Sequence, residues 1–130
     1  MANIAQSVNV ISPFMTTKDG LVKQTTWWPL LLFSRYMRGH TIATHTSSSC
    51  YEGETEPKWL KSAGETPWLD VSATVGEDGS VNLVVVNVHP DESFEVELDG
   101  MKGDNRSVEA YTVTGDRWEV VNTAEKEEVG

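Results

Sequence analysis

The side chains best suited to chemistry in this sequence gather between residues 47 and 65. Three serines, Ser47–Ser49, lie beside the lone cysteine, Cys50. Four acidic residues follow in the same stretch: Glu52, Glu54, Glu56 and Glu65. A serine or cysteine nucleophile needs a positioned base, often on a glycine-flanked elbow, and neither accompanies these residues. Clustered acids in a loop containing glycine and proline are typical of solvated surface, so we expect a polar loop without a catalytic residue.

The three histidines are His40, His45 and His89. Their spacing matches no metal-ligand pattern, and a single cysteine excludes both an internal disulfide and a cysteine-based zinc site. The sequence therefore predicts isolated histidines, no metal site and no cofactor.

The tryptophans allow two interpretations, sugar binding and packing. Trp59, Trp68 and Trp118 lie among predicted strands and loops, where an exposed aromatic face can stack on a sugar. Such residues on a β domain would indicate a carbohydrate-binding module. The alternative is packing in a core or a domain interface, which also suits Trp27 and Trp28 on a predicted helix.

Charge and hydropathy exclude several partners. The chain has 130 residues and a formal net charge of -10, which repels phosphate backbones and anionic lipid headgroups alike. The apolar run "WWPLLLF" is far shorter than the roughly 20 residues that cross a bilayer. We therefore expect neither a nucleic-acid partner nor a membrane partner.

The sequence also bears on localisation. Asn105-Arg106-Ser107 is an acceptor pattern for N-glycosylation in a polar turn. The chain begins without the basic region and apolar core of a signal peptide. The expectation is an extracellular location if a longer parent protein is secreted.

A helical pattern covers Thr25 to Met37. Thr25 or Thr26 can cap its start, Pro29 falls in the first turn, and Gly39 suits the position just after the end. Apolar side chains cover most of the circumference, which is typical of a helix buried on several sides. Such a helix needs a large partner surface.

Strand patterns occupy most of the remaining chain. Before the helix, residues 2–21 open with a short, apolar, strand-like segment that leads into a long loop through Pro13 and Gly20. After it, strands are expected within residues 41–46, 68–75, 80–88, 93–98, 107–114 and 117–121. Residues 76–79, "GEDG", predict a tight hairpin, and "VNLVVVNV" should be a central strand because both its faces are apolar. The polar end, residues 122–130, should fray.

Two spaced motifs resemble a known family. "AQSVNVISP" over residues 5–13, followed by "QTTWWPLLLFSRYMRG" over residues 24–39, closely resembles the end of the catalytic barrel in α-L-arabinofuranosidases of glycoside hydrolase family 51, in the form found in fungi. The rest resembles the β-sandwich that follows this barrel, most clearly in "WLDVSATV" and "VNLVVVNVHPD". The fold implied is mainly β: an antiparallel, jelly-roll-like sandwich preceded by the last strand-loop-helix unit of a (β/α)₈ barrel.

The resemblance implies two domains, both incomplete. Residues 1–40 would end the catalytic barrel, and residues 41–130 would form the C-terminal β-sandwich. The partner surface for the apolar helix would then be the missing barrel of the full-length enzyme. Met1 would be an internal position of that enzyme or the start of a truncated gene model.

The resemblance also implies the activity. The parent would release terminal α-L-arabinofuranosyl residues from arabinan, arabinoxylan and arabino-oligosaccharides with retention of configuration, using two glutamates upstream of this chain. Gln6 is similar to the family glutamine that hydrogen-bonds the sugar ring, while Asn9 is expected to support the same loop. Alone, the chain should be inactive; the alternatives are a non-catalytic carbohydrate-binding module and a structural fragment.

Overall fold

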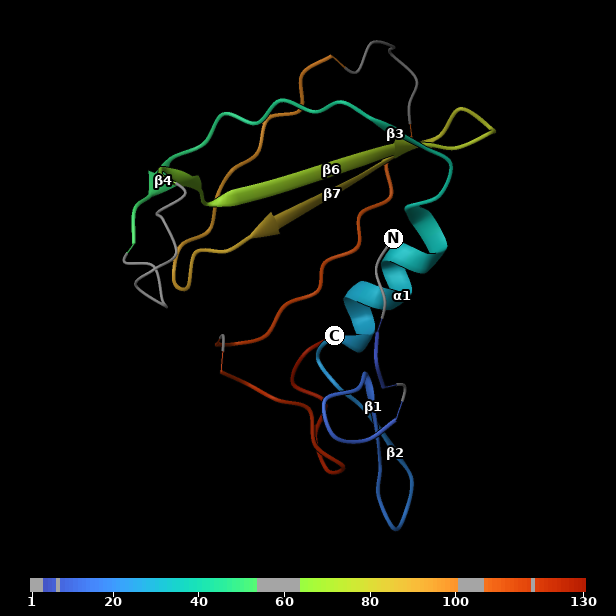
Figure 1. The fold of residues 1–130 in the computed structure, drawn as a ribbon. Helices are drawn as coiled ribbons and strands as arrows, with labels where there is room; N and C mark the ends of the chain where they lie inside the picture. The colour runs from blue at the N-terminus through green and yellow to red at the C-terminus, as the bar shows by residue number, and fades with distance from the viewer. Residues whose placement is uncertain (1–3, 7, 54–63, 101–106, 118) are drawn as a thin grey trace. The chain divides into compact units, whose positions relative to one another are not determined.

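The computed structural model describes residues 4–6, 8–53, 64–100, 107–117 and 119–130. Within them the protein is mainly β, with antiparallel sheets and one short helix. The chain divides into two compact units (Figure 1). Unit 1 comprises Met1–Tyr36 and Val96–Gly130, and unit 2 comprises Met37–Glu95.

Unit 1 begins with a hairpin where the sequence predicts a loop. Strands β1 (Phe14–Thr16) and β2 (Leu21–Lys23) pair in antiparallel register, with Met15 opposite Val22. The described residues that precede β1 form no strand and adopt bends and turns, so the strand-like opening that the sequence predicts is not found among them. A strand needs a neighbour for its backbone groups. Among the described residues, none pairs with this segment in a sheet.

The helix forms close to its predicted position. Helix α1 (Trp27–Tyr36) starts after Thr26, and its third residue is Pro29, which lacks the N–H that a first turn leaves unbonded. Its start packs on the hairpin: the rings of Phe14 and Trp27 lie 4.2 Å apart, and the Lys23 ammonium lies 4.6 Å from the Trp28 ring. No residue of α1 is buried within this chain. The described residues therefore do not supply the large partner surface that the sequence predicts for this helix, and its burial stays a prediction.

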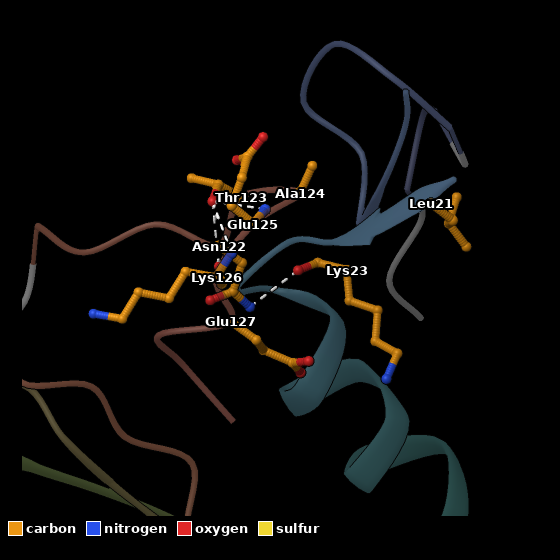
Figure 2. A pocket seen from close by; sticks show the side chains of 8 residues that line it. All are labelled: Leu21, Lys23, Asn122, Thr123, Ala124, Glu125, Lys126 and Glu127. Atoms are coloured by element: carbon orange, nitrogen blue, oxygen red, sulfur yellow. Dashed lines mark hydrogen bonds between the residues drawn. The ribbon is translucent and has the colours of Figure 1, made fainter. Parts of the chain in front are cut away.

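A polar clamp joins β2 to the end of the chain in unit 1. The Asn122 side chain is 6% exposed and makes four hydrogen bonds. Its amide nitrogen donates to the carbonyls of Lys23 and Val129, both at 3.0 Å, and its oxygen accepts from the backbone N–H groups of Glu128 and Val129 at 2.9 and 2.8 Å. Figure 2 shows the amide directed at the Lys23 carbonyl. The prediction that residues 122–130 fray is therefore wrong.

Unit 2 contains a three-stranded antiparallel sheet in the order β3-β6-β7. Its strands are β3 (His40–Ile42), β6 (Leu69–Val75) and β7 (Val81–Asn87). Figure 1 shows β6 and β7 as the long pair, with β3 beside the end of β6. A separate two-stranded sheet joins β4 (Cys50–Tyr51) to β5 (Thr66–Pro67).

The predicted hairpin between β6 and β7 is confirmed, with Val75 paired to Val81. Gly79 adopts a φ of 80°, a conformation that glycine enters without a steric penalty. The Asp78 carboxylate accepts hydrogen bonds from the Ser80 hydroxyl at 2.6 Å and the Ser80 N–H at 3.0 Å. These two bonds lower the pKa of Asp78 below its usual value.

Two strand predictions in unit 2 need correction. The apolar segment β7 lies at the edge of the described sheet rather than at its centre, and β6 holds the central place. Hydrophobicity on both faces does not distinguish a central strand from an edge that lacks a covering partner. The strand predicted over residues 41–46 is shortened to β3.

The strands predicted at residues 93–98 and 107–114 do not form, and the described residues of 117–121 form none either. Period-two patterning orients side chains but supplies no partner for the backbone, so the described residues of these segments form no ladder. The antiparallel sheets agree with a β-rich C-terminal domain. The sandwich, the barrel unit and the boundary between residues 40 and 41 stay predictions.

Gly39 has a different role from the predicted helix cap. It lies three residues beyond the end of α1 and adopts a φ of 95°. A Cβ atom at this position would lie 2.1 Å from the Val75 carbonyl oxygen. Gly39 therefore permits the close backbone approach with which β3 begins to pair with β6.

The clamp generates a stability prediction. Replacing Asn122 by alanine (Asn122→Ala) leaves partly buried backbone groups without partners and should lower the free energy of unfolding by about 2–3 kcal/mol. Urea denaturation followed by tryptophan fluorescence measures the change. The matched control is Asn87→Ala, which removes an exposed amide whose bonds to Glu92 and His89 water can replace. Equal losses in the two variants would contradict the role given to the clamp.

Candidate functional site

Gln6, the predicted substrate contact, is exposed in an irregular segment of unit 1. The turn that follows it contains two residues with positive φ. Asn9 and Val10 adopt φ values of 63° and 61°, and for a β-branched valine this conformation is strained. Gln6 thus precedes a tight turn whose geometry is fixed by its own hydrogen bonds.

Asn9 holds that turn together. Its side-chain oxygen accepts from the Thr16 N–H at 2.8 Å and the Thr16 hydroxyl at 3.0 Å, and its own N–H donates to the Phe14 carbonyl at 2.7 Å. The buried Ser12 hydroxyl donates to the same Phe14 carbonyl. Asn9 therefore supports the loop, as the sequence predicts, and its side-chain oxygen is already engaged.

A hollow of about 380 Å³ lies in unit 1 between β2 and the C-terminal turn (Figure 2). The residues that line it are Leu21, Lys23, Asn122, Thr123, Ala124, Glu125, Lys126 and Glu127. Its two carboxylates, Glu125 and Glu127, are exposed. Lys126 pairs with Glu128, whose carboxylate raises the pKa of the Lys126 ammonium by hydrogen bonding and by charge. We interpret this hollow as a solvated groove beside the Asn122 clamp.

An aromatic cluster lies in unit 2, formed by Tyr51, Trp68, His89 and Phe94. The Tyr51 and Trp68 rings stack with centroids 4.2 Å apart and planes inclined by 29°. The His89 ring lies 4.4 Å from Trp68, and Phe94 lies 6.0 Å from His89. Sequence reasoning selected Trp68 as a possible sugar contact and His89 only as an isolated histidine. It did not group the four residues, because they belong to separate strands and loops.

His89 is fixed within this cluster. Its Nδ1 accepts hydrogen bonds from the Asp91 N–H at 3.1 Å and the Glu92 N–H at 2.9 Å. Across residues 4–6, 8–53, 64–100, 107–117 and 119–130, no three His, Cys, Asp or Glu side chains gather as metal ligands. His89 serves as a turn residue and as an aromatic neighbour of Trp68.

Other predicted positions are dispersed or outside the described residues. His40, His45, Cys50, Glu52 and Glu65 are exposed. Glu54, Glu56, Trp59, Asn105 and Trp118 lie outside the described residues. Among the helices that the structure does describe, none is long and apolar enough to span a membrane.

The family model of the alpha-L-arabinofuranosidase C-terminal domain matches residues 1–130. The chain belongs to this family. It is 65% identical over all 130 residues to alpha-L-arabinofuranosidase C of Emericella nidulans, and equally so to a relative from Aspergillus terreus.

A bacterial relative is more distant. The intracellular exo-alpha-(1->5)-L-arabinofuranosidase of Halalkalibacterium halodurans is 35% identical over 115 residues, which cover 87% of this chain and 21% of that protein. The chain spans about a quarter, 25%, of each of the two fungal relatives. The match is therefore to a C-terminal part of longer glycoside hydrolases.

Tyr111 in unit 1 is the described group with the largest resolved pKa shift. Hydrogen bonding to the Tyr36 side chain, together with the charges of Tyr36 and Glu109, raises the pKa of Tyr111 from 10.0 to about 12. The two tyrosine rings stack with centroids 4.9 Å apart. Because the two rings stack, we interpret the pair as a contact between α1 and the C-terminal segment. Tyr111 is 55% exposed, so this contact lies at the surface.

This pair generates a titration prediction. A pKa above 10.0 in the folded state means that unfolding releases protons at high pH, so the contribution of Tyr111 to stability falls as pH rises from 10.0 towards 12. The variant Tyr36→Phe should move the Tyr111 midpoint back towards 10.0, measured by tyrosinate absorbance. Tyr51→Phe, in unit 2, is the control and should leave that midpoint near 12. An unchanged midpoint in Tyr36→Phe would show that Tyr36 is not the cause.

Proposed function

We propose that this chain is the C-terminal part of a retaining α-L-arabinofuranosidase. The parent protein would hydrolyse terminal α-L-arabinofuranosyl residues of arabinan, arabinoxylan and arabino-oligosaccharides, in L-arabinose metabolism and hemicellulose degradation. The observation that carries the proposal is the family match over residues 1–130, joined to 65% identity over the whole chain with a fungal arabinofuranosidase.

The exposed apolar surface of unit 1 supports a partner formed by the rest of that enzyme. Val10 and Ile11 are 72% and 84% exposed, and Phe33 on α1 is 42% exposed. Exposed apolar side chains on a turn and on a helix are the kind of surface that a partner covers. The proposed partner is the catalytic barrel, whose strands and helices would cover this turn and α1.

Gln6 is proposed to contact the substrate in the assembled enzyme. A side-chain amide offers both a donor and an acceptor, which suits the hydroxyl groups of a sugar. The exposure of Gln6 leaves its side chain available for this contact. Secretion of the parent is part of the same proposal, and the Asn105-Arg106-Ser107 pattern supports it.

The first test concerns activity. The purified 130-residue chain should release no arabinose from a chromogenic α-L-arabinofuranoside, because the two glutamates that retention requires are proposed to lie elsewhere in the parent. A longer protein that contains this sequence should turn over the same substrate and retain its anomeric configuration. Turnover by the purified short chain would overturn the predicted division of roles.

The second test concerns Gln6 within the longer protein. The variant Gln6→Ala should lower kcat/KM roughly tenfold or more, because one hydrogen bond to substrate in a largely dehydrated site is worth about 1.5 kcal/mol or more. Asn9→Ala is the matched control: it should lower thermal stability through the Thr16 bonds as well as activity. A Gln6→Ala enzyme with full kcat/KM would exclude the substrate contact.

A further inference from the structure

We propose that the exposed ring of Tyr51 is a binding platform for a neutral, arabinose-containing polysaccharide. The identity of the ligand rests on the proposed function, whereas the platform rests on the aromatic cluster of unit 2. Nothing in the family match assigns a sugar contact to Tyr51.

The first observation is the arrangement of the Tyr51 ring. It is inclined by only 29° to Trp68, so one face of the tyrosine is covered by the tryptophan. Tyr51 is nevertheless 36% exposed. A ring covered on one face and open to solvent elsewhere can stack on the C–H groups of a sugar.

The second observation is the support beneath that ring. Trp68 has two rings within 4.4 Å, Tyr51 and His89, so it packs rather than presenting a free face. Backbone bonds from Trp68 N–H to the Ser49 carbonyl, at 3.0 Å, and from Val88 N–H to the Trp68 carbonyl, at 2.9 Å, hold it in place. Tyr51 itself pairs with Thr66 across β4 and β5. A platform fixed in this way loses little conformational entropy when it binds.

The third observation is charge, which selects the ligand class. The exposed carboxylate Glu52 follows Tyr51, and Glu65 precedes its partner Thr66 in the β4–β5 pair. Carboxylates accept hydrogen bonds from sugar hydroxyls and repel anionic chains. With a net charge of -10 on the whole chain, a neutral glycan such as arabinan or arabinoxylan fits this surface, and an acidic one such as polygalacturonate does not.

The test uses the 130-residue chain and affinity electrophoresis in gels containing arabinan, arabinoxylan, unsubstituted xylan or polygalacturonate. Tyr51→Ala should raise the Kd for arabinan and arabinoxylan roughly tenfold, which is the size of effect expected for a central aromatic contact. Tyr51→Phe keeps the ring and should retain most of the binding. Near-ultraviolet circular dichroism checks that each variant keeps the fold.

The matched control is Tyr111→Ala, which removes another exposed tyrosine that stacks on an aromatic partner, in unit 1. It should leave the Kd unchanged. Absence of binding by the unaltered chain, full binding by Tyr51→Ala, or an equal loss in Tyr111→Ala would each overturn the platform. Equal binding to unsubstituted xylan or to polygalacturonate would overturn the assignment of ligand.

A further measurement separates this inference from the proposed function. In the longer protein, Tyr51→Ala should leave kcat/KM for a small chromogenic arabinofuranoside unchanged and raise KM for arabinan. If the longer protein cleaves the small substrate and Tyr51→Ala leaves the KM for arabinan unaltered, the platform is wrong and the proposed function stands. If the longer protein cleaves no arabinofuranoside while Tyr51-dependent glycan binding persists, the proposed function is wrong.

Discussion

The Asn122 amide is the interaction on which unit 1 depends. Its side chain donates to the Lys23 carbonyl, which lies 99 residues away in sequence, and also bonds the backbone of Glu128 and Val129. It thus uses both its donor and its acceptor capacity in a buried position. The apolar contribution in this unit is small, because Val22 is its one buried hydrophobic residue among those described. In a unit with so few buried apolar side chains, the hydrogen bonds of Asn122 hold β2 and the end of the chain together.

Unit 2 is organised by its backbone ladder. The seven-residue strands β6 and β7 pair along their whole length, and Leu69 and Ala73 on β6 are its buried hydrophobic residues within the described part of the chain. The aromatic cluster lies at the Leu69 end of that hairpin, since Trp68 precedes β6 and His89 follows β7 by two residues. The long hairpin therefore brings together aromatic side chains that are 21 residues apart in sequence.

Local signals in the sequence predicted local structure. The capping residues and Pro29 located α1, and "GEDG" located the turn between β6 and β7, because each depends on neighbouring residues alone. Pairing partners were not predictable in this way: the edge position of β7 and the Asn122 bond depend on segments far apart. The β1–β2 hairpin is local, but it forms where Pro13 and Gly20 predicted a loop. Of the candidate site, Asn9 was predicted from its motif. In the aromatic cluster, Trp68 was selected as a possible sugar contact and His89 was named only as an isolated histidine. The substrate role of Gln6 stays a prediction.

The edge position of β7 has a consequence for behaviour in solution. The strand carries no charged residue from Val81 to Asn87, and Val81, Val85 and Val86 are exposed. An uncharged, apolar edge is a template for pairing with other chains. The strong negative charge of the molecule opposes such encounters by long-range repulsion, which dissolved salt screens within about 10 Å at 0.1 M. Raising the ionic strength should therefore lower colloidal stability. The negative charge carried by the rest of the chain protects the uncharged strand β7 from pairing with other molecules.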